Sequence, residues 1–397
     1  MNIKLEKACV FGKLNAIPSK SYAHRISICN FLAGGSPKSG CENFTSKDIE
    51  ATERCLAVLS SGGSSLDCSE SGSTLRFLIP LCAALGGEYR LIGHGRLMQR
   101  PNEELFAVLR EHGITAEQSD CVRVSGKLTA GEYRIKGDIS SQYVTGLLMA
   151  LPILDGDSAI VLTTPLVSAP YVDITLEILS AFGVEITKQE NGYFIKGNQK
   201  YSGSALPEGD WSNVAFLLAL GAISGDITVN GLNLNSVQGD KKILEVLKSA
   251  GAKLTVKENS VRVEKSQLKA FILDAEDCPD LVPITAVIAA YADGRTQINN
   301  VERLKIKESD RIESTLKMLK SFGINAESDG HTLWVDGGRP VGGKEDSFND
   351  HRIAMALAVL ASGADGQSVI TNAQAVNKSY PTFFDDFRAV GGKASEF

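Results

Sequence analysis

Polar and charged side chains stand at the beginnings of segments that otherwise have the pattern of apolar helices. They occur in five of six such segments, at Lys20, Ser21 and Arg25, at Gly72, Ser73 and Arg76, at Ser140, Ser141 and Gln142, at Asp280, and at Asp350, His351 and Arg352. Such side chains are costly to bury and out of place on an apolar helix. Because backbone N–H groups and the helix dipole attract negative charge at a helix N-terminus, these positions predict sites for anions.

Loops before a second type of helix carry more residues of the same kind. They are Arg96, Arg100, Ser168, Tyr171, Lys307, Glu308, Arg311 and Lys378. The cations stand out because the chain has 41 Lys and Arg against 47 Asp and Glu, a formal net charge of −6. Arginine captures phosphate and carboxylate in a bidentate manner, and lysine adds mobile point charges. The pattern predicts polyanionic small molecules as ligands, one or two of them.

Each of these residues also has a purely structural interpretation. A single Arg or Lys is more often a surface residue or half of an ion pair, and Ser140 with Ser141 is most often a helix N-cap. Asp280 is as readily a cap as a catalytic group, and Asp350 as a cap leaves His351 in a positioning or core role. The functional interpretation depends on recurrence, because the same kind of residue returns at the same place in successive units.

Two kinds of helix recur, each followed by glycine. The apolar kind is predicted at 19–35, 71–87, 140–156, 211–225, 278–294 and 349–363, and the amphipathic kind at 55–63, 105–113, 176–183, 243–251, 316–323 and 384–392. Gly113, Gly183, Gly251, Gly323 and Gly391 are separated by 70, 68, 72 and 68 residues, and each suits the left-handed position after a helix. With short alternating runs between the helices, this spacing predicts six α/β units of about 65 residues.

Three units on each side of a midpoint predict two similar α/β domains. The turn-rich segment around Leu206 marks the midpoint, and the alternating N-terminal run is expected to pair back with the C-terminal half. The predicted domains are residues 1–14 with 207–397, and 15–206 as an insertion. Helix N-termini of equivalent units are expected to point toward a common surface, so that the two domains face each other across an anion-binding cleft.

Composition and missing motifs exclude several other classes of protein. The acidic charge argues against a general nucleic-acid or membrane binder, and no apolar run is long enough to span a bilayer. Eight scattered cysteines without a CxxC pair are typical of reduced thiols in a cytoplasmic protein, and no metal is expected. Residues 338–345 nearly match a phosphate-binding loop, but Glu345 stands where Ser or Thr would bind magnesium. Kinases, dehydrogenases and hydrolases are therefore disfavoured.

The same residues make the chain resemble the EPSP synthase family of enolpyruvyl transferases. The matching motifs are PSKSYAHR (18–25), SGSTLR (71–76), GRLMQRP (95–101), DISSQY (138–143), SAPYVDIT (168–175), PDLVP (279–283), KESDR (307–311), NDHRIAM (349–355) and NKSYPTFF (377–384). The resemblance implies two domains, each of three βαβαββ units in an inside-out α/β barrel. It also implies transfer of the enolpyruvyl group of phosphoenolpyruvate to the 5-hydroxyl of shikimate 3-phosphate, which releases phosphate without a cofactor.

The resemblance implies a role for each motif residue. Contacts with shikimate 3-phosphate are implied for Lys20, Ser21, Arg25, Ser140, Ser141, Gln142, Ser168, Asp280 and Lys307, and contacts with phosphoenolpyruvate for Lys20, Gly72, Arg96, Gln142, Arg311, Arg352 and Lys378. Asp280 matches the general base and Glu308 a proton-transfer residue. Because the cations beside Glu308 favour its ionised form, Lys20 or Lys378 could share the donation of a proton. Tyr171 and Arg76 are implied as supports of the site.

Some residues depart from the family pattern, and alternatives stay open. Glu70, Phe77 and Arg303 stand where relatives commonly carry Asn, Pro and Asn, which affects the details of substrate contacts.

The first alternative is the sibling enzyme acting on UDP-N-acetylglucosamine, which typically has a reactive loop cysteine where the loop at 95–101 has none. The second is a non-catalytic anion-binding protein on the same scaffold, against which the presence of both Asp280 and Glu308 argues. A monomeric cytoplasmic enzyme of aromatic amino acid biosynthesis and a target of glyphosate is the expectation.

Overall fold

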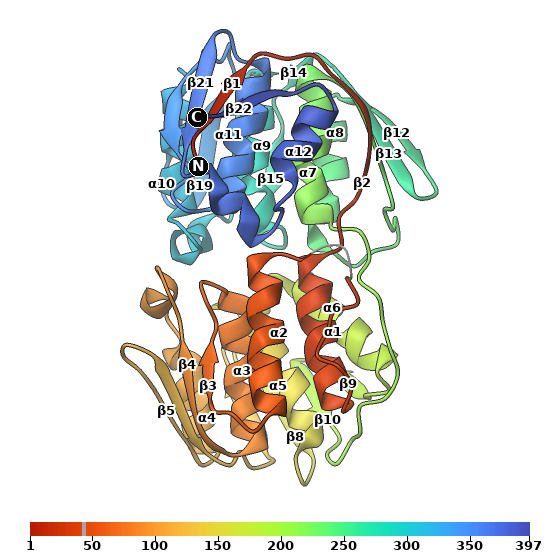
Figure 1. Cartoon of the computed structure of the whole chain (residues 1–397), viewed down its shortest axis with the longest axis vertical. Helices are drawn as coiled ribbons and strands as arrows, with labels where there is room; N and C mark the ends of the chain where they lie inside the picture. Colours follow the sequence, from red (N-terminus) through yellow and green to blue (C-terminus); the bar gives the residue numbers. More distant parts are fainter. Residues whose placement is uncertain (42–44) are drawn as a thin grey trace. The chain divides into compact units, whose positions relative to one another are not determined.

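The computed structural model describes residues 1–41 and 45–397, which form two compact units. Unit 1 comprises Met1–Ser19 and Glu208–Phe397, and unit 2 comprises Lys20–Pro207 (Figure 1). Residues 15–19, which the sequence analysis placed with the inserted domain, lie with unit 1. Pro18 there forms a β-bridge with Gly209, and the Ser19 N–H donates to the Glu208 carbonyl over 2.8 Å.

One βαβαββ pattern recurs in both units. Its strands form a four-stranded sheet in which the first two strands are parallel and the others antiparallel, as in the sheet β3-β4-β6-β5. In unit 2 the elements of this pattern are β3 (Ser65–Asp67), α3 (Gly72–Leu85), β4 (Gly87–Ile92), α4 (Glu103–Glu111), β5 (Ile114–Gln118) and β6 (Val122–Gly126), followed by β7 (Glu132–Ile135), α5 (Ser141–Ala150), β8 (Ser158–Leu162), α6 (Ala169–Ala181), β9 (Ile186–Gln189) and β10 (Gly192–Ile195).

The first repeat of unit 2 consists of α1 (Lys20–Leu32) and α2 (Lys47–Ser60). Within residues 33–41 and 45–46, the described part of the connection between them, no strand is formed. This repeat therefore contributes its helices, but no strand of its own from the described connection. The short 3-10 helices η1 (Leu97–Gln99) and η2 (Leu151–Ile153) complete unit 2.

Unit 1 repeats the pattern three times. The three sheets have the orders β12-β13-β11-β2, β15-β17-β19-β18 and β20-β21-β1-β22, and β14 with β16 forms a two-stranded pair. The helices are α7 (Trp211–Ser224), α8 (Ile243–Ser249), α9 (Val282–Ala290), α10 (Arg311–Ser321), α11 (His351–Gly363) and α12 (Phe383–Ala389), with η3 (Gly239–Lys242), η4 (Pro279–Leu281), η5 (Glu302–Ile306) and η6 (Ala373–Lys378). The strands are β11 (Gly225–Asn230), β12 (Lys253–Lys257), β13 (Ser260–Glu264), β14 (Leu268–Lys269), β15 (Ile272–Asp274), β16 (Ala292–Asp293), β17 (Arg295–Asn299), β18 (Ala326–Ser328), β19 (Thr332–Asp336), β20 (Lys344–Asp346), β21 (Gln367–Thr371) and β22 (Lys393–Glu396).

The N-terminal strands complete two sheets of unit 1. β1 (Ile3–Glu6) lies antiparallel between β21 and β22, with Ile3 opposite Ile370 and Glu396. β2 (Val10–Asn15) lies parallel to β11. The expected pairing of the opening run with the C-terminal half is confirmed.

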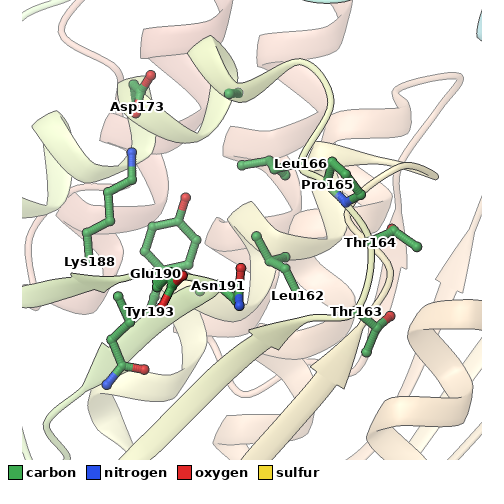
Figure 2. A pocket seen from close by; sticks show the side chains of 13 residues that line it. Leu162, Thr163, Thr164, Pro165, Leu166, Asp173, Lys188, Glu190, Asn191 and Tyr193 are labelled. Carbon is green, nitrogen blue, oxygen red and sulfur yellow. The ribbon is translucent and has the colours of Figure 1, made fainter.

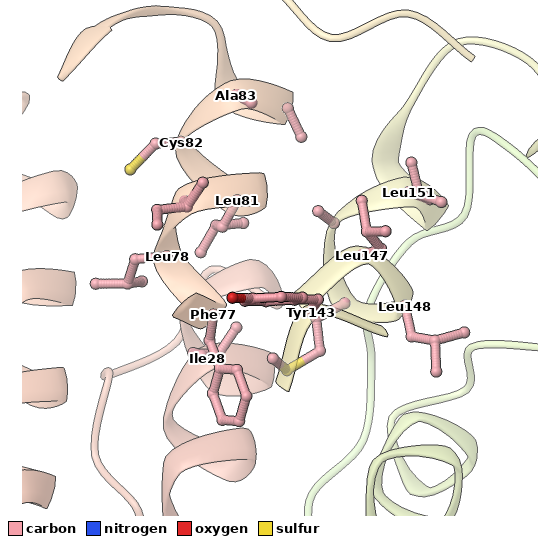
Figure 3. Packing of buried hydrophobic residues seen from close by; sticks show 14 of the residues in the cluster. Ile28, Phe77, Leu78, Leu81, Cys82, Ala83, Tyr143, Leu147, Leu148 and Leu151 are labelled. Atoms are coloured by element: carbon pink, nitrogen blue, oxygen red, sulfur yellow. The ribbon is translucent and has the colours of Figure 1, made fainter. Parts of the chain in front are cut away.

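The apolar helices form the interior of each unit, and the sheets cover them. α3 packs on α5 in unit 2, and α11 packs on α7 and α9 in unit 1. Figure 3 shows Phe77 and Leu81 of α3 near Tyr143 and Leu147 of α5, all of them fully buried. Each such side chain contributes about 1.5–3 kcal/mol through burial. These packed helices hold the polar residues of their first turns in fixed places.

The amphipathic helices end as the glycine spacing predicted. Gly113, Gly183, Gly251, Gly323 and Gly391 all have positive φ, between 70° and 95°. A residue with a Cβ is strained in this conformation, so glycine ends these helices at little cost. No helix in the described part of the chain is both long and apolar enough to cross a membrane.

Candidate active site

In unit 2 the first turns of α1 and α6 come together around Arg25. Its Nε donates to Thr175 Oγ1 of α6 over 2.7 Å, and Nη2 donates to the Tyr171 carbonyl over 2.8 Å. Nη1 donates to the carbonyl of Ser21 over 2.6 Å, which ties the guanidinium to its own helix. Burial lowers the pKa of Arg25 to about 10, so it stays charged at neutral pH. Arg25 thus fixes the loop that carries Ser168 relative to the first turn of α1.

A second arginine joins the beginnings of α3 and α5. Arg76 Nη1 donates to Gln142 Oε1 over 2.8 Å, and its Nε donates to Asn102 Oδ1 over 3.1 Å. Gln142 in turn donates from Nε2 to Ser73 Oγ over 3.0 Å. Arg76 therefore holds Gln142 in place, as expected of a supporting residue, and Gln142 spans the first turns of the two helices.

Gly72 lies against an arginine of the following loop. A Cβ added at Gly72 would come within 2.5 Å of Arg100 Nη1, so the absence of a side chain leaves room for this guanidinium. Arg100 is buried, whereas Arg96, four residues earlier, is exposed. The start of α3 and this loop therefore place the Arg100 guanidinium against Gly72 and leave Arg96 at the surface of unit 2.

Lys20 is the first residue of α1 and forms an ion pair with Asp48 of α2, with Nζ 2.8 Å from Oδ2. Behind this pair, His24 Nδ1 lies 2.7 Å from Thr52 Oγ1. Burial, together with Lys20 and Arg25, lowers the pKa of His24 well below its ordinary value, so its ring is neutral. Asp48 was missed by the sequence analysis, because an acidic residue in the first turn of a helix is common and carries no specific signal.

The serines of the site lie at helix beginnings. Ser140 is the N-cap of α5, and its side chain accepts from the Gln142 N–H. Ser141 is the first residue of α5. Ser168 is buried and precedes α6 with φ 54°, a left-handed conformation that is rare for a residue other than glycine. Such strain persists only where the surroundings impose it, and it clusters at functional sites.

Unit 1 holds a compact cluster of opposite charges around Arg311. This side chain is 1% exposed. Its Nη1, Nη2 and Nε each lie 2.7 Å from a carboxylate oxygen, those of Asp280, Glu308 and Asp350 respectively. Burial alone would lower the pKa of Arg311, but Asp350, Glu308 and Asp280 raise it well above its ordinary value. Arg311 therefore fixes three acids that come from separate segments.

Asp280 is surrounded by three cations. Besides Arg311, Arg352 Nη2 lies 2.7 Å from its Oδ2, and Lys307 Nζ lies 3.7 Å from its Oδ1. Burial by itself would raise the pKa of Asp280, but Arg352, Lys307 and Arg311 hold it well below its ordinary value. Burial lowers the pKa of Lys307 to about 8, although Asp280 acts in the opposite direction. In this arrangement Asp280 is ionised. It forms ion pairs with cations that could instead bind an anionic ligand.

The other predicted residues of unit 1 lie at neighbouring helix ends. Lys378 Nζ donates to the Asn349 carbonyl over 2.6 Å, next to the beginning of α11. Asp350 is the N-cap of α11 and accepts from the Arg352 N–H. Its predicted role as a cap is confirmed, but its ion pair with Arg311 was not foreseen. His351, beside it, is buried.

The predicted residues thus fall into two half-sites. The half-site of unit 2 contains Lys20, Ser21, Arg25, Gly72, Arg96, Ser140, Ser141, Gln142 and Ser168, and that of unit 1 contains Asp280, Lys307, Glu308, Arg311, Arg352 and Lys378. Within each unit, the contacts of Arg25, Gln142 and Arg311 link residues of neighbouring helices, and the convergence of all helix N-termini on a common surface stays a prediction. Within the described residues, no group of three or more His, Cys, Asp and Glu side chains could hold a metal ion.

A separate pocket lies next to the half-site of unit 2. It has a volume of about 480 Å³ and is lined by the β8–α6 loop and the β9–β10 hairpin (Figure 2). Asp173, Lys188 and Tyr193 are among its polar residues, and none of the predicted site residues lines it. The pocket adjoins the site through Ala169, the residue after Ser168.

Solved structures share this fold over the full chain. An EPSP synthase from Acinetobacter baumannii superposes with a TM-score of 0.80 at 22% identity and covers 100% of both chains. The enolpyruvyl transferase NikO from Streptomyces tendae superposes with a TM-score of 0.77 at 16% identity, covering 99% of this chain and 98% of its own. The two units and their βαβαββ repeats therefore have the fold of the enolpyruvyl transferases.

Sequence relatives narrow this class to one family. The family model for EPSP synthase (3-phosphoshikimate 1-carboxyvinyltransferase) matches residues 46–387. The 3-phosphoshikimate 1-carboxyvinyltransferase of Clostridium kluyveri is 41% identical, with 97% of this chain and 96% of its own covered. That of Brachyspira hyodysenteriae is 38% identical, with 99% of both covered. The chain belongs to the EPSP synthase family, and this match favours the main prediction over the UDP-N-acetylglucosamine alternative.

Proposed function

We propose that this enzyme transfers the enolpyruvyl group of phosphoenolpyruvate to the 5-hydroxyl of shikimate 3-phosphate, within the shikimate pathway of aromatic amino acid biosynthesis. The observation that carries the proposal is the placement of Asp280 among Arg311, Arg352 and Lys307. A carboxylate held among cations can act as a base next to the groups that would bind anionic substrates. When phosphate and carboxylate groups of the substrates take these cations, Asp280 loses ion-pair partners and becomes a stronger base.

The roles proposed for the other residues draw on both half-sites for each substrate. Shikimate 3-phosphate is held by Lys20, Ser21, Arg25, Ser140, Ser141, Gln142, Ser168, Asp280 and Lys307. Phosphoenolpyruvate is held by Lys20, Gly72, Arg96, Gln142, Arg311, Arg352 and Lys378. Arg25 already donates to Thr175, Tyr171 and Ser21, which supports a role in shaping the shikimate 3-phosphate loop in addition to any direct contact.

The reaction is an addition followed by an elimination. Asp280 takes the proton of the 5-hydroxyl as its oxygen bonds to the carbon of phosphoenolpyruvate that carries the phosphate, while an acid protonates the methylene carbon. The tetrahedral adduct then loses a proton from the new methyl group and expels phosphate, which restores the double bond. General acid and base groups contribute about 10²–10⁴-fold each. Holding two mutually repelling anions together supplies up to about 7–11 kcal/mol more in well-oriented cases.

The acid that protonates the methylene carbon is the least direct assignment. Glu308 pairs with Arg311, which favours the carboxylate form. We propose that phosphoenolpyruvate takes over Arg311, so that Glu308 loses this partner and can carry the proton. Lys20 and Lys378 are the other donors within the proposed set.

Steady-state turnover with both substrates tests the proposed function. Phosphate release that requires both phosphoenolpyruvate and shikimate 3-phosphate is the expected result. Release with UDP-N-acetylglucosamine in place of shikimate 3-phosphate would support the sibling activity. Binding of both anions without any phosphate release would support a non-catalytic protein.

We also propose that the two half-sites act on one pair of substrates, in a monomeric cytoplasmic enzyme. Neither half-site alone contains all the groups that the reaction needs, so substrate binding is expected to bring the two units into a closed state that excludes water. Small-angle scattering is expected to give a smaller radius of gyration when shikimate 3-phosphate and glyphosate are added together. A radius that does not change at saturating ligand would argue against closure, and the scattered intensity at zero angle would report the oligomeric state.

Glyphosate is expected to compete with phosphoenolpyruvate. It is a small molecule with a carboxylate and a phosphonate, the same kinds of anionic group that the proposed cations would hold in phosphoenolpyruvate. Gly72 lets the Arg100 guanidinium lie against the start of α3, where a Cβ would collide with it. Rising glyphosate should increase the KM for phosphoenolpyruvate and leave kcat unchanged, while the KM for shikimate 3-phosphate should not increase. Tight phosphoenolpyruvate binding together with indifference to millimolar glyphosate would contradict the prediction.

A further inference from the structure

Asp240 is a buried acid that neither the motifs nor the proposed mechanism uses. It lies in η3, and it is 3% exposed. Ser212, in the first turn of α7, donates to its Oδ2, whereas its Oδ1 is buried without a hydrogen-bond partner among the described residues. A buried carboxylate oxygen without a donor is costly, so its retention calls for an explanation.

The fold places Asp240 beside the proposed base. η3, η4 and α11 all pack against α7, and these elements carry Asp240, Asp280 and Arg352 respectively. Asp240 is close enough to Asp280 and Arg352 to interact with both electrostatically. Asp240 also interacts electrostatically with Asp210, the N-cap of α7, and with the buried thiol of Cys278 before η4. Asp240 is thus a buried negative charge next to Asp280, in addition to the acids that pair with Arg311.

The electrostatics of Asp280 indicate a function for the negative charge of Asp240. Arg352, Lys307 and Arg311 favour the ionised form of Asp280, and His351 of α11 acts in the same direction. A carboxylate that holds its charge so firmly is a poor acceptor of a proton. A fixed negative charge nearby opposes the cations and increases the affinity of Asp280 for a proton. Asp240 opposes the effect of the cations on Asp280 in every step of the reaction, because it belongs to the protein and does not leave with a substrate or product.

We propose that Asp240 is a positioning residue for the reaction, which acts on Asp280 through its charge and so sets how readily Asp280 takes the proton of the substrate hydroxyl. This proposal rests on the proposed function, because it takes Asp280 as the base. Asp240 touches no substrate in this scheme. A purely structural role, in which Asp240 only holds Ser212 at the start of α7, predicts a change in stability and none in the pH dependence of turnover.

The titration of Asp240 makes the two roles distinguishable. Burial raises the pKa of Asp240 to about 6, and Asp280 acts in the same direction, whereas Arg352 and the hydrogen bond from Ser212 lower it. As pH falls through this value, Asp240 loses its charge and Asp280 becomes a weaker base. Turnover is therefore expected to fall on the acid side, in addition to any effect of the substrate phosphates, which titrate in the same range.

The experiment compares pH profiles of kcat for the wild type and three variants. Asp240→Asn should lower kcat at neutral pH by about three- to tenfold, since it removes the charge but keeps the shape, and its profile should lose one titration near pH 6. Ser212→Ala should move that titration to higher pH, because it removes a hydrogen bond that favours the ionised form. Asp226→Asn, which changes a partly exposed acid of β11 paired with Arg262, should keep the wild-type profile. An Asp240→Asn profile identical to that of the wild type would overturn the proposal.

A stability measurement separates this inference from the proposed function. Because the folded-state pKa of Asp240 lies above the ordinary value of 3.8, the wild type loses stability as pH rises from about 4 to 6. Asp240→Asn lacks this loss, so its Tm should exceed that of the wild type at pH 8, and the difference should narrow toward pH 4. A wild type without turnover would count against the proposed function, while this Tm pattern would still report the buried charge. A Tm difference that does not vary with pH would refute the titration on which the inference depends.

Discussion

Asp280→Ala is expected to reduce kcat by about 10²-fold or more while leaving the binding of phosphoenolpyruvate as tight as in the wild type, or tighter. The loss follows from removal of the general base, which typically contributes 10²–10⁴-fold. The affinity for phosphoenolpyruvate is retained because of the ion pairs. Asp280 lies 2.7 Å from Arg311 and from Arg352 and competes with an incoming anion for both. Isothermal calorimetry and steady-state kinetics measure the two effects separately.

The combination of lost turnover and retained affinity is what identifies a base. A residue that only held the substrate would raise KM or the dissociation constant when replaced. Asp277→Ala, which removes an exposed acid three residues earlier, serves as the matched control and is expected to keep wild-type kinetics. Wild-type turnover in Asp280→Ala would transfer the role of base to another group, and weakened phosphoenolpyruvate binding would indicate that Asp280 mainly organises the cations.

The elements of the fold could be predicted because they depend on local patterns. The apolar helices were expected at 71–87 and 349–363, and they form at Gly72–Leu85 and His351–Gly363. A helix buried on all sides needs an apolar sequence on all sides, and a glycine with positive φ ends a helix whatever lies around it. The pairing of β1 with β21 could be inferred only because the run precedes the first repeat and lacks a local partner.

The residue types of the site could be predicted, but their partners could not. Polar residues on apolar helices drew attention to Arg311 and Arg352, since burial of such groups is costly. That Arg311 bridges Asp280, Glu308 and Asp350 depends on three segments meeting in space, and no spacing along the chain encodes this. The partner of Lys20 at Asp48 was missed for the same reason. Asp240 was missed because a Gly-Asp turn before a helix has an ordinary explanation as a loop.

Arg311→Met is expected to destabilise unit 1 by about 3–5 kcal/mol, the usual cost of removing one partner from a buried ion pair. Arg311 is 1% exposed, and its removal leaves Asp280, Glu308 and Asp350 without their shared cation. Methionine is shorter than arginine, but it is flexible and fills part of the space, so the loss reflects charge more than a cavity. Urea unfolding followed by fluorescence and circular dichroism measures it, with the two units analysed as separate transitions where they unfold separately.

The pH dependence of this loss shows whether uncompensated carboxylates cause it. Because the cations hold the pKa of Asp280 below its ordinary value, the stability that they provide is present above about pH 4 and is lost as pH falls below it. The difference between Arg311→Met and the wild type should therefore shrink in acid, as the stranded acids take up protons. Lys317→Met removes an exposed cation of α10 that pairs with Glu313 at 2.7 Å, and it should leave the stability nearly unchanged because solvent screens this pair. An Arg311→Met loss as small as this, or one that stays constant in acid, would mean that substituted packing rather than charge governs the centre of unit 1.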